Sequence, residues 1–154
     1  MQVIGIRASA KEIRYAILDK VTDADIVFVN KDEEHCLRYP ATVQTIEDKL
    51  HWVKQEFDRI LRQHTSIGKI IIKMNEYAGT ENGAKRETSY IDAVILLVAA
   101  EKNILVERKL YSQIGTTSRQ TKEHAESRVG KTEKYWNTTM ADALNCAFWE
   151  IRRG

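Results

Sequence analysis

The sequence predicts an α/β domain in which helices flank a mixed sheet, with the element order βββαβαβα. Strand-like segments with short links fill the first fifth of the chain, as in an antiparallel meander. Two more β-branched segments then alternate with helical segments, the pattern of parallel strands joined by crossover helices. A chain of 154 residues with 43% hydrophobic content fills one core and is too short for two. We therefore expect a single domain over residues 1–154.

The first three strands are expected at residues 2–7, 12–19 and 25–30. The link between the first two is short, which favours an antiparallel hairpin, and the third strand continues the meander. A polar segment over residues 31–38 follows, and Pro40 marks a boundary before a helix.

An amphipathic helix is predicted next, with Thr42 as its N-cap. Its apolar residues recur at helical spacing along one face, which indicates packing on a sheet rather than a coiled coil, because the pattern stops after about three heptads. The stripe consists of Val43, Ile46, Leu50, Val53, Phe57 and Ile60.

Residues 69–74 (KIIIKM) form a β-branched run typical of a central strand covered on both faces and parallel to the first strand. A loop with Gly79, Asn82 and Gly83 leads to a helix over residues 85–102, which Asn103 is suited to cap. A strand, a helical turn and a closing helix are then expected at residues 104–108, 111–114 and 138–152.

Composition and spacing exclude several classes of protein. The net charge of +2 is small and its charges are interspersed, so no polyelectrolyte tail is present. The apolar run over residues 91–100 is shorter than the roughly 20 residues a membrane span needs, and no signal peptide opens the chain, so we expect a cytoplasmic protein without membrane contact. Cys36 and Cys146 lack metal-ligand spacing and are expected to be ordinary thiols.

Four segments in this order resemble the ribonuclease H-like fold, and in particular its branch of RuvC-type Holliday junction resolvases. The carriers are residues 3–7 (VIGIR), 70–73 (IIIK), 104–106 (ILV) leading to 111–114 (YSQI), and 140–145 (MADALN). The chain also resembles small uncharacterised bacterial proteins of RuvC-like fold in which the active site is degraded.

This resemblance implies where an active site would lie. In the resolvases, four carboxylates at the ends of two strands and the start of the last helix bind two divalent metals for phosphodiester hydrolysis. The matching residues here are Arg7, Lys73, Thr139 and Asp142. Only Asp142 is an acid, so the resemblance implies a catalytically inactive relative without metal or other cofactor.

We expect Asp142 to pair with Lys73 or Arg7, since a buried charge without a partner is costly. Two simpler interpretations stay open: Arg7 as a solvent-facing residue at a strand end, and Asp142 as an acid that the helix dipole stabilises.

Two further functions stay open beside the inactive relative. An active nuclease using Mg²⁺ or Mn²⁺ would need a relocated carboxylate near Asp142, for which Glu76 is the first candidate and Glu81 and Glu87 are others. A protein interaction module, such as a homodimer, would use the large aromatic residues Trp52, Trp136 or Trp149 as anchors.

A basic segment near the C-terminus suggests DNA or RNA as a partner, because lysine and arginine grip a phosphate backbone while nearby aromatic rings can stack on bases. Interspersed glutamates weaken this pattern, and a solvated loop is its simpler interpretation. The candidate residues are Arg119, Lys122, Arg128, Lys131 and Lys134.

Overall fold

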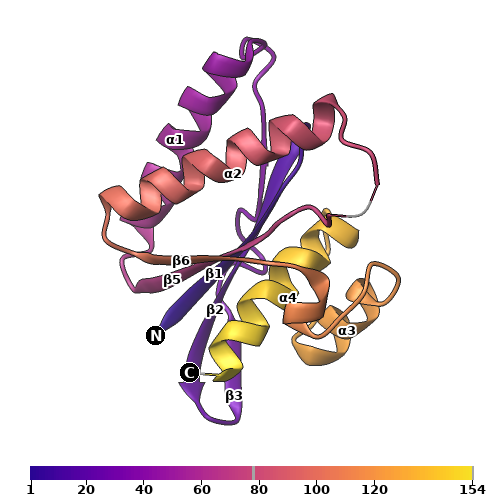
Figure 1. The fold of residues 1–154 in the computed structure, drawn as a ribbon. Coiled ribbons are helices and arrows are strands. Elements are labelled where there is room, and N and C mark those ends of the chain that lie inside the picture. Colours follow the sequence, from indigo (N-terminus) through magenta and orange to yellow (C-terminus); the bar gives the residue numbers. More distant parts are fainter. Residues whose placement is uncertain (78, 154) are drawn as a thin grey trace.

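The computed structural model describes residues 1–77 and 79–153, which form a six-stranded mixed sheet with helices on both faces (Figure 1). The strands are β1 (Gln2–Ala8), β2 (Glu12–Thr22), β3 (Asp25–Phe28), β4 (Cys36–Arg38), β5 (Ile67–Lys73) and β6 (Leu105–Lys109). The helices are α1 (Ile46–Gln63), α2 (Gly83–Glu101), α3 (Thr121–Arg128) and α4 (Thr138–Arg153), with a 3-10 turn, η1, at Tyr111–Ile114.

The sheet order is β3-β2-β1-β5-β6, with β4 paired to the first residues of β2, Glu12 to Arg14. Strands β1, β2 and β3 form the expected antiparallel meander, and β5 is parallel to both β1 and β6. Because β5 lies between two strands and under helices on both faces, its side chains from Ile70 to Lys73 are all buried. The apolar run of β5 therefore belongs to a central strand covered on both faces, as predicted.

Alternating side chains of the strands feed two separate cores, one on each face of the sheet. Ile4, Ile6 and Ile72 pack with α1 and α2, whereas Val3 and Ile71 pack with α4. Figure 1 shows α1 and α2 together on one side of the sheet and α4 on the other, with α3 beside α4. Within the described residues, no helix combines the length and apolar character needed to cross a membrane.

Gly5 allows α4 to approach the sheet closely. A Cβ atom at this position of β1 would collide with the carbonyl oxygen of Ala143 and lie 2.8 Å from the backbone nitrogen of Ala147. Alanines at the facing positions of α4 complete a contact in which helix and strand backbones nearly touch. This close approach brings the first turns of α4 next to the ends of β1 and β5.

The first helix begins later than predicted, and Thr42 is not its N-cap. Residues 40–43 form a turn in which the Val43 amide donates to the Pro40 carbonyl, 2.9 Å away. Thr45 caps the helix instead, because its hydroxyl accepts from the Asp48 amide at 3.2 Å.

The third strand is shorter than predicted, because at Asn30 the side chain, and not the backbone, forms hydrogen bonds with β2. Asn30 is buried, and its Oδ1 accepts from the Ile17 amide at 2.7 Å while its Nδ2 donates to the Tyr15 carbonyl at 3.2 Å.

Two elements were not predicted, β4 and α3. Strand β4 has three residues within a polar segment, and α3 buries only Thr121 and Ala125, so neither shows a recognisable hydrophobic period. Asn103 does follow a helix end, as expected, with a positive φ of 55° just after the last turn of α2.

Candidate functional site

Arg7 and Lys73 lie side by side on the α4 face of the sheet. The residues before them, Ile6 and Ile72, are paired across the parallel strands β1 and β5, and both strands end shortly afterwards. The period-2 alternation sends Ile6 and Ile72 to the α1–α2 core, so the next residue in each strand faces α4. The Arg7 guanidinium donates from Nη1 to the Lys73 carbonyl at 3.0 Å, which fixes the two strand ends together.

Asp142, in the first turns of α4, faces this pair and is 1% exposed. One carboxylate oxygen, Oδ1, accepts from the Thr121 hydroxyl at 2.8 Å, and Oδ2 accepts from the Tyr111 hydroxyl at 3.0 Å. Arg7 Nε lies 3.5 Å from Oδ2, so the expected ion pair is present with Arg7. Burial raises the pKa of Asp142, while the Thr121 hydrogen bond and the Arg7 charge oppose that rise.

Lys73 is fully buried, but its contacts differ from the expected ion pair with Asp142. Its ammonium donates to the Met74 carbonyl at 2.6 Å and lies 3.9 Å above the centre of the Tyr111 ring. Burial lowers the pKa of Lys73 and the neighbouring Arg7 charge lowers it further, whereas Glu76 and Asp142 oppose that shift. The aromatic face and one carbonyl are therefore the direct contacts of this ammonium, and the neighbouring charges act on it as well.

The resulting charge cluster of Arg7, Lys73 and Asp142 does not fit a pair of divalent metals. Such metals take oxygen ligands from several carboxylates, whereas this cluster offers one carboxylate whose two oxygens both accept hydrogen bonds from protein hydroxyls. Thr139, at the fourth implied position, is half-buried near the start of α4. Across residues 1–77 and 79–153, no three His, Cys, Asp or Glu side chains gather closely enough to hold a metal.

The candidate relocated acids each have a partner of their own. Glu76 is exposed and accepts from the Tyr111 backbone amide at 3.1 Å, so it braces the start of η1. Glu81 pairs with Arg86 at 3.4 Å on the surface, and Glu87 pairs with Lys49 at 3.4 Å between α2 and α1.

Only some of the candidate nucleic-acid-binding residues are available at the surface. Arg119 is exposed just before α3, and Lys122 is exposed in its first turn. Lys134 is exposed in the following loop, and Lys131 pairs with Glu126 at 3.6 Å. Arg128 is half-buried and has a structural role. Its guanidinium donates to the carbonyls of Ile114 and Gly115 and to Asn145 Oδ1, at 3.2, 2.6 and 3.2 Å, and so ties α3 to η1 and α4.

The three tryptophans are partly buried against the cores. Trp52 packs on the α1–α2 core, and Trp136 and Trp149 pack on the α4 core. All three rings thus take part in the packing of the two cores.

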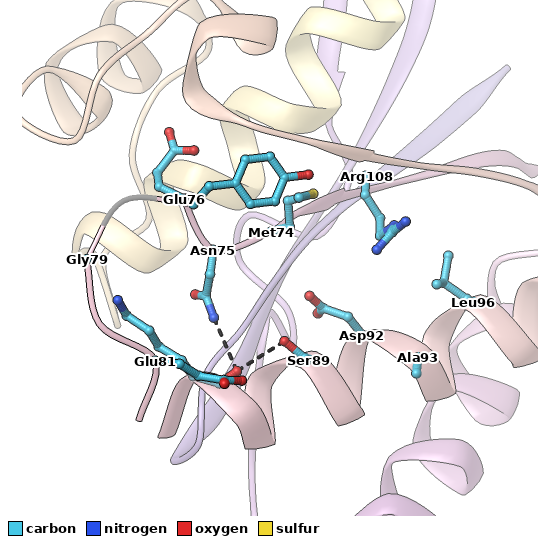
Figure 2. Close-up of a pocket in the computed structure, with 12 residues that line it drawn as sticks. Met74, Asn75, Glu76, Gly79, Glu81, Ser89, Asp92, Ala93, Leu96 and Arg108 are labelled. Carbon is cyan, nitrogen blue, oxygen red and sulfur yellow. Dashed lines mark hydrogen bonds between the residues drawn. The ribbon is translucent and has the colours of Figure 1, made fainter. Parts of the chain in front are cut away.

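A pocket that sequence reasoning missed lies between the loop after β5, helix α2 and strand β6 (Figure 2). Its volume is about 360 Å³, and Asp92 and Arg108 are among its lining residues. Asp92 is 6% exposed, and burial raises its pKa to about 7. The signal was present in the sequence, because Asp92 shares a helical stripe with Thr88, Ile91 and Ile95, where an acid is unusual.

The sequence matches no protein-family model and no curated protein. Among solved structures, RuvC of Thermus thermophilus superposes with a TM-score of 0.79 over 99% of this chain and 94% of that chain, at 12% identity. The same protein in complex with a Holliday junction substrate gives a TM-score of 0.78 over 99% and 93%, also at 12% identity. The yeast mitochondrial Holliday junction resolvase Ydc2 gives 0.61 over 97% and 77%, at 14% identity. The chain thus has the RuvC-like form of the ribonuclease H-like fold, as the sequence resemblance implied.

Proposed function

We propose that this protein binds branched or single-stranded nucleic acid without hydrolysing it, and that the charge cluster replaces a two-metal centre. The observation that carries the proposal is the contact set of Asp142. Both of its oxygens are occupied by hydroxyl donors, and an arginine stands 3.5 Å away. The carboxylate that would bind a metal in a resolvase is here part of a closed internal network.

Electrostatics favour the same conclusion. Two unit charges about 4 Å apart interact by roughly 4 kcal/mol at an effective dielectric near 20, so a divalent ion would be repelled by roughly 8 kcal/mol from each nearby cation. One carboxylate does not offset repulsion from both Arg7 and Lys73. Two-metal hydrolysis needs metals that hold the attacking and leaving oxygens, and this cluster supplies no such pair of sites.

The support for nucleic acid as the partner is the solved RuvC complex together with exposed cations near the cluster. That structural neighbour is described with a Holliday junction substrate. Here Arg119 is exposed just before α3 and Lys122 in its first turn, beside Thr121, which contacts Asp142. Tyr77, in the loop after β5, is 81% exposed and offers a ring on which a base can stack.

The test is fluorescence anisotropy with a four-way junction, a duplex and a single strand, each titrated at 50 and 200 mM salt. We expect junction or single-strand binding that weakens with salt. The variant Arg119→Ser/Lys122→Ser should weaken binding and reduce the slope of log affinity against log salt by about 2, at about 0.9 for each lost phosphate contact with duplex arms.

A matched control removes two cations from the opposite face of the sheet, Lys54→Ser/Arg62→Ser on α1. This control should leave binding unchanged. No binding at 50 mM salt would overturn the nucleic-acid proposal. Cleavage of any of these substrates with Mg²⁺ or Mn²⁺, abolished in Asp142→Ala, would overturn the inactive assignment and favour a relocated acid.

A further inference from the structure

His35 has two hydrogen-bond partners that a neutral histidine cannot satisfy together. Its side chain, just before β4, is 7% exposed. Nδ1 lies 2.8 Å from the Glu33 carbonyl oxygen, and Nε2 lies 3.0 Å from the Lys134 carbonyl oxygen. A carbonyl oxygen only accepts, and a neutral imidazole has one N–H and one nitrogen lone pair. The neutral ring would therefore place a lone pair against a carbonyl, whereas the imidazolium donates to both.

The hydrogen bond to Lys134 connects two segments that are far apart in the sequence. His35 is fixed to the sheet, because its own carbonyl accepts from the Tyr15 amide of β2 at 3.0 Å. Lys134 belongs to the loop between α3 and α4, residues 129–137, and its carbonyl also accepts from the Thr132 hydroxyl at 2.6 Å. The imidazole thus holds the α3–α4 loop against the strand pair of β2 and β4.

The α3–α4 loop is held in a strained conformation at the residue after Lys134. Tyr135 has a positive φ of 59°, which is uncommon for any residue except glycine and costly for a bulky one. Arg14 opposes this strain, because its Nη1 donates to the Tyr135 carbonyl at 2.9 Å and its guanidinium lies 4.9 Å from the ring centre. Arg38 covers the same ring at 4.7 Å. Loss of one hydrogen bond at Lys134 therefore weakens a loop that already contains strain.

Charges of both signs surround His35. Four acids, two lysines, a thiol and a phenol share its groove between the α3–α4 loop and the residues before β4: Asp32, Glu33, Glu34, Glu133, Lys31, Lys134, Cys36 and Tyr135. From β2 and β4, Arg14 and Arg38 stack on the Tyr135 ring, whose centre lies 5.9 Å from that of the imidazole. Both arginines pair with Glu12. These charges largely offset one another, so the two carbonyl acceptors decide which form of His35 the docked loop requires.

We propose that His35 is a pH-sensitive latch, in which the doubly protonated ring holds the α3–α4 loop on the sheet and loss of one proton releases it. Histidine ordinarily changes charge between about pH 5 and pH 8. Because the docked loop requires a proton that the released loop can give up, docking is favoured at low pH and weakens as the pH rises. The loop carries Lys131 and Lys134, so its release moves two of the candidate nucleic-acid-binding residues. The latch does not rest on the function proposed above, because all of its parts lie within the chain.

The test is NMR of the whole, nitrogen-15-labelled chain from pH 5 to pH 9. An unprotonated ring nitrogen resonates far downfield of a protonated one, so the spectrum distinguishes the two forms of His35 directly. We expect two protonated nitrogens at pH 5 and one at pH 9. The backbone order parameters of residues 133–136 should fall with the same midpoint, from about 0.85 toward values below about 0.6.

His35→Gln removes the titrating ring but keeps a side chain that can donate a hydrogen bond. In this variant the order parameters of residues 133–136 should not change with pH over the same range, and the ring signals that disappear identify those of His35. His51→Gln is the matched control, because it makes the same change at an exposed position of α1. Its α3–α4 loop should show the pH dependence of the wild type.

A common midpoint for the His35 nitrogens and the loop, lost in His35→Gln and kept in His51→Gln, supports the latch. A His35 ring with one proton at every pH, or with two protons even at pH 9, would overturn it. Titration of His35 with no change in the loop would overturn it as well. If His35→Gln does not fold, the two wild-type midpoints decide the question alone. None of these measurements contains nucleic acid, so their outcome is separate from that of the binding assay.

Discussion

Removal of the Asp142 carboxylate should destabilise the protein strongly, because it leaves two neighbouring cations without their shared acid. Asp142→Ala deletes hydrogen bonds of 2.8 and 3.0 Å from Thr121 and Tyr111 and the ion pair of 3.5 Å with Arg7. Breaking a buried ion pair at one partner costs about 3–5 kcal/mol, and the overlapping contributions here make that range the expected total. For a chain of this size, the Tm should fall by roughly 6–20 °C.

The pKa directions explain why one deletion is costly although the intact cluster adds little net stability. Burial raises the pKa of Asp142 and lowers that of Lys73, so both charged forms are held at a desolvation cost. When the acid is removed, this cost remains for the cations and the offsetting attraction is lost.

The assay is urea unfolding at pH 7 followed by circular dichroism, with the slope m unchanged between variants. Asp142→Asn, which keeps an acceptor for Thr121, should be intermediate between wild type and Asp142→Ala. Lys73→Met in the Asp142→Ala background should recover part of the loss, with a coupling of about 0.5–3 kcal/mol. A cost for Asp142→Ala below about 0.5 kcal/mol, or fully additive effects, would refute the reasoning.

Three further predictions concern stability, each measured by the same unfolding assay. Burial raises the pKa of Asp92 from 3.8 to about 7, so the free energy of unfolding of the wild type should fall as the pH rises between those values. Relative to the wild type, Asp92→Asn should be more stable by up to about 4 kcal/mol at pH 8 and little different near pH 4. A difference that does not depend on pH would contradict this. Gly5→Ala should lower the free energy of unfolding by more than about 4 kcal/mol, because its Cβ meets the α4 backbone. Gly68→Ala should be tolerated, because its Cβ meets only the Met1 side chain. Equal effects of the two substitutions would argue against the close contact between β1 and α4. Arg128→Ala should lower the free energy of unfolding by about 1–3 kcal/mol, because two carbonyls lose their donor. Arg119→Ala, at an exposed position, should lower it by less than about 0.5 kcal/mol. A larger loss in Arg119→Ala than in Arg128→Ala would contradict the structural role of Arg128.

The sequence by itself determined the fold class and most of the strands, and its resemblance to the resolvases indicated Arg7, Lys73 and Asp142 as one site. Hydrophobic period and β-branched composition are local properties, so they marked β1, β5 and the long helices correctly. Strand alternation and the parallel pairing of β1 with β5 then follow from general rules, and these rules bring Arg7 and Lys73 to one face. Short elements such as β4 and α3 escaped because they contain too few buried residues to show a period.

Only the tertiary structure decided which partner each polar side chain has. Asp142 contacts Thr121 and Tyr111, which lie 21 and 31 residues away along the chain, and no local pattern encodes such contacts. For the same reason Arg128 turned out to brace α3 rather than to face solvent, and Asp92 turned out to lie in a pocket. Local sequence determines secondary structure through short-range preferences, whereas the environment of a side chain is set by segments that meet only when the sheet and its two helical layers pack together.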